Sequence, residues 1–193
     1  MGVCMANTEN FYSYLEKAAK FHGHACVGTA MGTKITLAAL KALDLDPQQK
    51  TRDLIVYAEI DRCMTDSVQA ITGCSLGRRS LKHVDYGKFA ATFVNIATGK
   101  AVRATIKEDF PTKGPKEEVI QSIATTSYQD MVILQEVQIE IAETDLPGPP
   151  REKAVCAACG ERVMDARSII RNGATFCKAC ADGAYYNTTG NKG

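Results

Sequence analysis

Two cysteine pairs near the end of the chain constrain its fold more than any other feature. Each pair has the spacing C-x-x-C, and seventeen residues separate the two pairs. A C-x-x-C turn presents two thiolates to one ion, and four thiolates satisfy the tetrahedral preference of Zn²⁺ while closing its coordination sphere. The pattern therefore predicts one structural zinc ion held by Cys156, Cys159, Cys177 and Cys180.

The residues between the pairs predict the shape of this unit. Asn172 and Gly173 lie between two short extended segments, and Asn-Gly tolerates the positive φ angles of a type I′ hairpin turn. The second pair then leads into a short helix. A cysteine turn, a hairpin and a helix in this order indicate a treble-clef or zinc-ribbon module. Two disulfides, or redox-active dithiols, are the alternatives to zinc.

The segment before the zinc module reads as a linker. TDLPGPPREKA, residues 144–154, carries three prolines and one glycine and has no apolar period, so we expect it to be extended and semi-rigid. The predicted organisation is a core domain over residues 1–145, a proline-rich linker over 146–154 and the zinc module over 155–193.

Apolar spacing in the core domain alternates between helical and strand periods. Because the two kinds of segment mix without a regular βαβ repeat, the fold class is predicted to be α+β. The expected helices cover residues 8–20, 26–45, 64–73 and 115–126, and the expected strands are 54–60, a hairpin over 88–107 that turns at Gly99, and 137–141. The helix over 26–45 is apolar on nearly every face, which predicts that it is buried all round.

Charge and composition limit the classes of partner. The formal net charge is only +1, so no global field attracts nucleic acid or an anionic membrane. The chain has no secretory leader and no apolar run of about 18 residues, which predicts a cytoplasmic protein with reduced thiols and no membrane partner. The zinc module has a mild excess of basic residues, so nucleic acid stays an alternative to protein docking or dimerisation.

A second cluster of metal-binding residue types lies in FHGHACVGTAMG, residues 21–32. His22, His24 and Cys26 occupy every second position there, just before the buried helix. A thiol at a helix N-terminus favours the thiolate, and a mixture of imidazole and thiolate suits Zn²⁺ or another transition metal. Cys63 and Cys74 are candidates to complete this site. If the site is catalytic, Cys26 or Cys63 is the nucleophile or thiolate ligand and His24 is a ligand or general base.

The same residues also have a purely structural interpretation. Cysteines such as Cys63 and Cys74 are often inert members of a core, and a histidine beside glycine often only holds a loop in place. Gly28 and Gly32, spaced as G-x-x-x-G, predict close helix packing rather than phosphate binding.

Three stretches together resemble the FmdE family of formylmethanofuran dehydrogenase proteins: FHGHACVGTAMG, DRCMTDSVQAITGCSLGRRSL and DYGKFAATF. The resemblance implies an α+β core, a C-terminal treble-clef zinc finger and an intertwined dimer. It also implies association with a molybdenum or tungsten oxidoreductase, of which the FmdE protein is not the pterin-bearing part. The family's His and Cys cluster maps onto His22, His24, Cys26, Cys63 and Cys74.

We therefore expect a dimeric zinc protein whose core pocket binds a metal or a small ligand and has the residues for catalysis. Two hypotheses of other classes remain. The first is an accessory protein that handles molybdenum, tungsten or another metal, and the second is a zinc-finger regulator that contacts nucleic acid.

Overall fold

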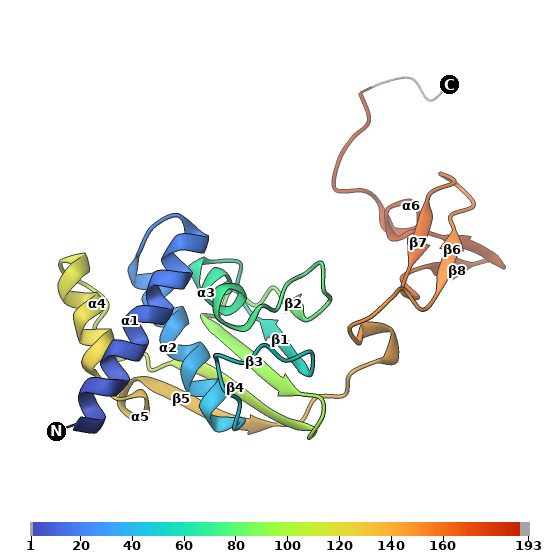
Figure 1. Cartoon of the computed structure of the whole chain (residues 1–193). Helices are drawn as coiled ribbons and strands as arrows, with labels where there is room; N and C mark the ends of the chain where they lie inside the picture. The colour runs from blue at the N-terminus through green and yellow to red at the C-terminus, as the bar shows by residue number, and fades with distance from the viewer. Residues whose placement is uncertain (1, 190–193) are drawn as a thin grey trace. The chain divides into compact units, whose positions relative to one another are not determined.

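The computed structural model describes the backbone of residues 2–189 and the side chains of residues 10–189. The chain divides into two compact units, and the boundary lies between Glu140 and Ile141. Figure 1 shows the core unit in blue to yellow and the C-terminal unit in brown to red. In the described part of the chain, no helix is both long and apolar enough to span a membrane.

The core unit contains helices and strands in mixed order, which confirms the predicted α+β class. Its helices are α1 (Gly2–His22), α2 (Val27–Ala42), α3 (Cys63–Thr72), α4 (Lys116–Thr125) and the short α5 (Tyr128–Met131). Its strands are β1 (Leu54–Ala58), β2 (Leu81–His83), β3 (Ala90–Asn95), β4 (Lys100–Ile106) and β5 (Val132–Val137).

The five strands form one sheet in the order β2-β1-β3-β4-β5. Only β1 and β2 are parallel, and α3 connects them. Alternate residues of the strands, among them Val56, Phe93 and Val102, belong to one buried apolar cluster together with residues of α1, α2 and α3. The helices therefore cover the face of the sheet that carries this cluster (Figure 1).

Helix α2 is the centre of the core. Nine of its sixteen residues are buried, and they lie on most faces of the helix, as its apolar sequence predicted. Two glycines also end or turn elements of the core unit where the sequence indicated. Gly73 caps α3 in the left-handed conformation with φ 74°, and Gly99 turns the β3–β4 hairpin with the same φ.

One predicted strand lies at a different place. The sequence predicted alternation through Val137, Ile139 and Ile141, but β5 ends at Val137. The reason is pairing: Val137 is opposite Ala101, and β4 itself begins at Lys100. The same register places Gln138 opposite Lys100, the first residue of β4, so Ile139 and Ile141 lie beyond the start of that strand and their alternation does not produce a ladder.

The C-terminal unit consists of two small hairpins and a helix. Its elements are a 3-10 turn (Glu143–Asp145), β6 (Lys153–Val155), β7 (Arg162–Met164), β8 (Ile169–Arg171), β9 (Ala174–Phe176) and α6 (Lys178–Asp182). The predicted Asn-Gly turn joins β8 to β9, with φ of 51° at Asn172 and 75° at Gly173. The first cysteine pair lies between β6 and β7, and the second begins α6.

Candidate metal centres

Cys26 is the N-terminal cap of α2. The Thr29 N–H donates a hydrogen bond of 3.3 Å to Cys26 Sγ, and the Cys26 N–H donates one of 3.0 Å to Thr29 Oγ1. These two bonds form a capping box in which a thiol takes the place usually filled by a hydroxyl. The cap fixes the position of the sulfur at the positive end of the helix dipole.

Cys63 is the first residue of α3, and close packing brings it to Cys26. A Cβ on Gly28 would lie 3.0 Å from Cys63 Cβ, and one on Gly32 would lie 2.8 Å from Met64 Cα. Only glycine allows helices to approach so closely, which confirms the packing interpretation of the G-x-x-x-G spacing. The buried Ser67 hydroxyl also joins the two helices, because it donates a hydrogen bond of 2.9 Å to the Thr29 carbonyl.

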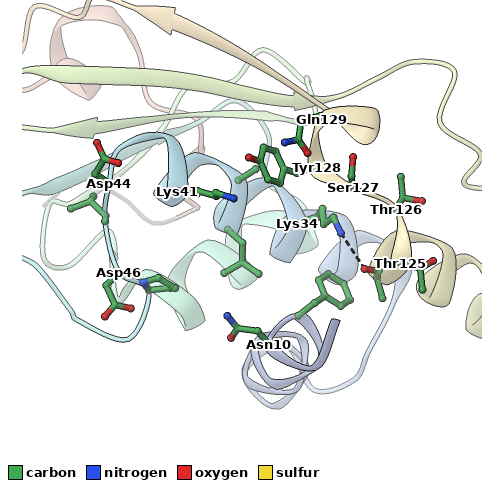
Figure 2. A pocket seen from close by; sticks show the side chains of 16 residues that line it. Asn10, Lys34, Lys41, Asp44, Asp46, Thr125, Thr126, Ser127, Tyr128 and Gln129 are labelled. Atoms are coloured by element: carbon green, nitrogen blue, oxygen red, sulfur yellow. Dashed lines mark hydrogen bonds between the residues drawn. The ribbon is translucent and has the colours of Figure 1, made fainter. Parts of the chain in front are cut away.

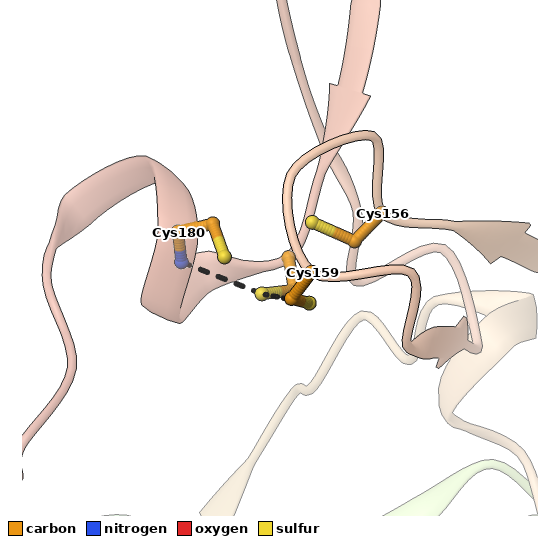
Figure 3. A group of neighbouring side chains, drawn as sticks. Cys156, Cys159 and Cys180 are labelled. Atoms are coloured by element: carbon orange, nitrogen blue, oxygen red, sulfur yellow. Dashed lines mark hydrogen bonds between the residues drawn. The ribbon is translucent and has the colours of Figure 1, made fainter. Parts of the chain in front are cut away.

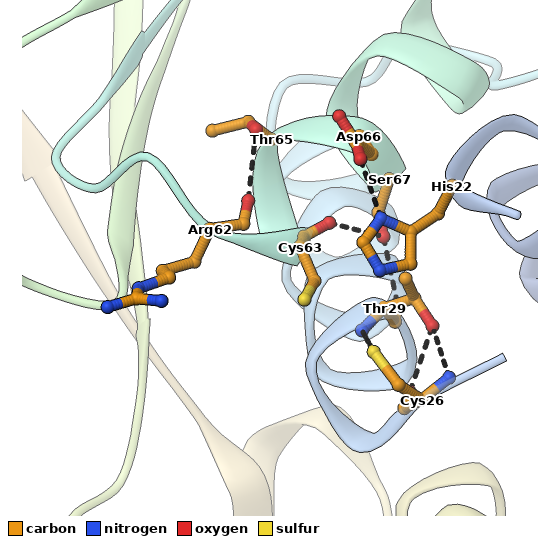
Figure 4. Close-up of polar contacts among 8 residues, drawn as sticks. All are labelled: His22, Cys26, Thr29, Arg62, Cys63, Thr65, Asp66 and Ser67. Atoms are coloured by element: carbon orange, nitrogen blue, oxygen red, sulfur yellow. Dashed lines mark hydrogen bonds and ion pairs between the residues drawn. The ribbon is translucent and has the colours of Figure 1, made fainter. Parts of the chain in front are cut away.

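His22, at the end of α1, is the third member of the group. One ligand atom each from His22, Cys26 and Cys63 lies within 4.8 Å of the other two. His22 Nδ1 lies 2.7 Å from Asp66 Oδ2, and Figure 4 shows the imidazole between Asp66 and the two sulfurs. An ionised carboxylate only accepts hydrogen bonds, so Nδ1 donates the proton and Nε2 keeps a lone pair for a metal. We call these three residues the core centre.

The electrostatics of the core centre set its two thiols apart. Burial works against ionisation of Cys26, but hydrogen bonds from Thr29, Cys63 and the Gly28 N–H lower the pKa of Cys26 overall. Burial and the neighbouring Cys26 sulfur raise the pKa of Cys63. The hydrogen bond to Asp66 raises the pKa of His22. One thiolate therefore forms readily, and a cation is needed to stabilise the second.

The other two predicted members lie outside the core centre. His24 is exposed, and its ring centroid is 4.8 Å from that of His22. Gly23, with φ 101°, turns the chain between them, and the group of close ligand atoms from His22, Cys26 and Cys63 does not include His24. Cys74 is buried, with Sγ 3.5 Å from the Leu54 carbonyl oxygen.

Sequence reasoning did not pair Asp66 with His22. It also missed Thr29, although C-x-x-T after a helix break has the spacing of a capping box. That spacing was the available signal.

The four cysteines of the C-terminal unit form the second group. One sulfur from each lies within 4.8 Å of the others. Figure 3 shows the side chains of Cys156, Cys159 and Cys180 converging between the cysteine turn and α6. Cys177 caps α6, and the Cys180 N–H donates to its sulfur at 3.4 Å. Gly160, with φ 74°, closes the first turn by donating to the Cys156 carbonyl.

These sulfurs fit a tetrahedral thiophilic ion. Backbone N–H groups of Cys159 and Cys177 lower the pKa of Cys156 to about 6, whereas its three sulfur neighbours raise the pKa of Cys180 to about 12. Four thiolates therefore need a cation between them. Sulfurs bound to Zn²⁺ at about 2.3 Å stand about 3.8 Å apart, and those of Cys159 and Cys177 are 4.0 Å apart.

The fold and the two groups define a class of protein: a mixed helix and sheet core with a His/Cys centre, followed by a four-cysteine zinc module. Residues 21–146 match the family model described as FmdE, molybdenum formylmethanofuran dehydrogenase operon. Because this match covers more than half of the chain, the chain belongs to the FmdE family. Residues 149–186 match the prokaryotic dksA/traR C4-type zinc finger.

Two individual proteins are similar to this chain. A probable S-adenosyl-L-methionine-binding protein of Archaeoglobus fulgidus is 29% identical over 203 residues, covering 91% of this chain and 54% of the relative. The chain thus spans about half the length of that relative. A crystal structure of a tungsten formylmethanofuran dehydrogenase FmdE-like protein from Syntrophus aciditrophicus has the same fold, with a TM-score of 0.62, 21% identity, and coverage of 92% of this chain and 95% of that chain.

Proposed function

We propose that the core centre binds one divalent transition metal through His22, Cys26 and Cys63 and leaves a coordination position for a small ligand. The observation that carries this proposal is that three ligand atoms from three helices lie within 4.8 Å of one another. Three protein ligands with an open position are typical of catalytic zinc sites, whereas four cysteines are typical of structural ones.

The surrounding residues support such a role. Asp66 orients the imidazole and selects the nitrogen that faces the sulfurs, as carboxylates do behind metal-binding histidines. Both sulfurs lie at helix N-termini, and hydrogen bonds lower the pKa of Cys26, so this thiol is the one that ionises first. All three ligands are half-buried, so a small molecule can reach them. When bound, the ion would supply Lewis acidity to that molecule.

His24 has a separate task in this proposal. Its exposed ring lies beside that of His22, outside the ligand set. This is the position of a group that exchanges protons between a bound ligand and solvent. We therefore assign proton transfer to His24, and metal binding to the other residues of the stretch.

Handling of a metal is the second candidate function, and the half-buried state of the ligands favours it. An ion at such a centre can leave without unfolding of the chain. Transfer of the ion to a coloured chelator within seconds, while the zinc finger keeps its own ion, would support metal handling. Retention of both ions for hours would support the fixed centre.

Cobalt spectroscopy tests the open position directly. The full chain is loaded with Co²⁺ at both centres and titrated with azide, a small anionic ligand. We expect azide to shift the visible bands of the wild-type protein and of Cys74→Ala, whose buried cysteine lies outside the core centre. We expect no shift in the double variant C26S/C63S. Equal shifts in that variant and in the wild type, or no shift in either, would contradict the proposal.

The assembly of the protein stays a prediction. A homodimer, and association with a molybdenum or tungsten oxidoreductase complex, follow from the family resemblance alone. Nucleic acid as a partner of the zinc finger likewise remains an alternative.

A further inference from the structure

The two thiols of the core centre lie close enough together to react with each other. Cys26 Sγ and Cys63 Sγ are within 4.8 Å of one another. A Cβ on Gly28 would lie 3.6 Å from the first sulfur and 3.3 Å from the second, so both sulfurs face the same spot. Figure 4 shows the two side chains at the N-terminal ends of α2 and α3. This placement suits a disulfide between the two helices, in which the sulfurs close to about 2.05 Å.

Helix packing holds both cysteines in this position. Gly32 lies against the Met64 backbone. The Ser67 hydroxyl donates a hydrogen bond of 2.9 Å to the Thr29 carbonyl. These contacts do not involve the two sulfurs, so they keep the ends of α2 and α3 together whether or not an ion is bound. Rotation of the two cysteine side chains can therefore join the sulfurs while the backbone stays in place.

That rotation removes only one half of the cap of α2. The Thr29 N–H loses its 3.3 Å bond to Cys26 Sγ. The Cys26 N–H keeps its bond of 3.0 Å to Thr29 Oγ1, and this hydroxyl keeps its bond of 2.9 Å to the Cys26 carbonyl. The N-terminus of α2 therefore stays capped when the sulfur turns away.

Exposure sets this pair apart from the remaining cysteine of the described core unit. Cys26 and Cys63 are both half-buried, so a small oxidant can reach them from solvent. Cys74 is only 3% exposed, and its sulfur lies against the Leu54 carbonyl. The four finger cysteines differ in another way, because a bound ion closes their coordination sphere and leaves no position for a reactant.

The pair is also separate from the cavity of about 680 Å³ that Figure 2 shows between α1, α2 and the turn from α4 to α5. Charged side chains of both signs line this cavity, namely Lys34, Lys41, Asp44 and Asp46. Among the described residues, its lining includes no cysteine and no histidine. The oxidisable sulfurs therefore belong to the surface of the core centre and not to the cavity.

We infer that Cys26 and Cys63 form a redox-sensitive pair, which a hydroperoxide converts to a disulfide with release of the core ion. The release step rests on the proposed function, whereas the disulfide depends only on where the sulfurs lie. One sulfur attacks the peroxide, so that an S–O bond forms, the O–O bond breaks, and a sulfenic acid and an alcohol (water, from hydrogen peroxide) result. The other sulfur then attacks the sulfenic sulfur, an S–S bond forms, and water leaves. The two sulfurs lose two electrons in total, and the peroxide gains them.

The disulfide and the ion exclude each other. A divalent metal binds cysteine as the thiolate, and sulfurs joined in a disulfide carry no such charge. Oxidation thus removes two of the three ligands and leaves His22 alone, so the ion dissociates. A dithiol reductant returns two electrons to the sulfurs and restores the site. The pair therefore makes metal occupancy of the core centre depend on the redox state of its surroundings.

Peptide mapping of the full, zinc-loaded chain tests this inference. The chain is treated with hydrogen peroxide, its free thiols are blocked with N-ethylmaleimide, and tryptic peptides are analysed by mass spectrometry. Because residues 63–78 form one tryptic peptide with two cysteines, the mapping uses the Cys74→Ala variant. We expect a linked pair of peptides that joins Cys26 to Cys63, and loss of one of two zinc ions to a coloured chelator. Dithiothreitol should reverse both changes.

Variants of the pair are the matched controls. Cys63→Ser should give no linked peptide, and its Cys26 sulfenic acid should react with dimedone. C26S/C63S should release no zinc under the same treatment. No linked peptide from the oxidised chain would overturn the inference even if two ions are counted per chain, and a linked peptide without loss of zinc would overturn the release step. A single ion per chain before oxidation would contradict the proposed function, whereas a linked peptide from that chain would still support the redox pair.

Discussion

At the scale of single residues, Asp66 decides what His22 can do. The carboxylate lies 2.7 Å from Nδ1, and this one contact fixes both the orientation of the ring and the nitrogen left for a ligand. The pair is only partly exposed, at 19% for the histidine side chain and 31% for the aspartate, so solvent does not fully screen it. Asp66 is therefore a positioning residue of the core centre.

Replacing Asp66 by Asn should weaken metal binding at the core centre by about 10-fold to 100-fold, the usual effect of losing such a carboxylate. The amide does not hold the ring nitrogen in the same protonation state. Competition for Zn²⁺ against a coloured chelator measures the change. Asp61→Asn, at an exposed aspartate just before α3, is the control and should bind as the wild type does. Equal affinities of both variants would show that Asp66 has no such role.

At the residue scale, the sequence predicted the zinc ligands but not which candidate ligands of the core centre lie together. The two C-x-x-C pairs were sufficient to predict their convergence, because their spacing is a local property. The HGHAC stretch, with the two later cysteines, predicted five candidate ligands, and the structure places three of them together. His24 lies beside His22 but outside the ligand group, and the position of Cys74 depends on contacts far along the chain. Neither could be read from spacing.

At the scale of elements, the crossing of α2 and α3 builds the core centre. Gly32 lies against the backbone of Met64, so the two helices meet at the distance that a glycine allows. Any side chain there moves Cys63 relative to Cys26. The geometry of the centre thus depends on a residue that contributes no ligand atom.

Gly32→Ala should destabilise the chain by about 1 to 3 kcal/mol through overpacking and should weaken metal binding at the core centre. Urea denaturation followed by circular dichroism measures the first effect, and chelator competition the second. Gly77→Ala is the matched control, since nothing lies within 4 Å of a Cβ at that position. An unchanged midpoint for Gly32→Ala would contradict the close approach.

An ion pair joins β4 to the residue that follows β1, across β3. Arg103 donates two hydrogen bonds to the buried Glu59 carboxylate, at 2.6 and 2.8 Å, and this contact raises the pKa of Arg103. Arg103→Met should cost about 2 kcal/mol, less than a fully buried pair because the arginine is partly exposed. The double variant E59Q/R103M should recover part of that loss in urea denaturation. A double variant no more stable than Arg103→Met would show that the unpaired carboxylate is not the cause.

Predictions of helices and strands succeeded where the apolar period in the sequence was strong. They failed where pairing with another strand determines whether a strand forms or where it ends. Helices α2 and α3 and the β3–β4 hairpin lie where apolar spacing and the stop signals at Gly73 and Gly99 indicated. Strand β2 has three residues, too few for a period, and forms only because β1 offers a parallel edge. The end of β5 is set by the start of β4, which its own sequence does not contain.

At the scale of the whole molecule, the two units obtain their stability from different sources. The core unit has a large buried apolar cluster that spans its helices and sheet. In the C-terminal unit, among the residues that the structure describes, Cys156 is the one side chain of the buried core. A unit with so little apolar burial depends on its metal to fold.

Removal of metal should therefore unfold one unit and leave the other folded. We expect trypsin to cut the chelator-treated chain at the basic residues of the zinc finger, and the core unit to survive as a resistant fragment. The zinc-loaded chain should resist trypsin in both the zinc finger and the core unit. Loss of the whole chain at one rate, or equal resistance with and without chelator, would contradict separate sources of stability.

The proposed function requires that the folded chain hold two metal centres of different kinds. Elemental analysis of the Zn²⁺-saturated, desalted protein counts them. We predict two ions per chain for the wild type, one for C26S/C63S and one for C159S/C180S. One ion per chain in the wild type, unchanged in C26S/C63S, would show that the zinc finger is the protein's sole metal centre.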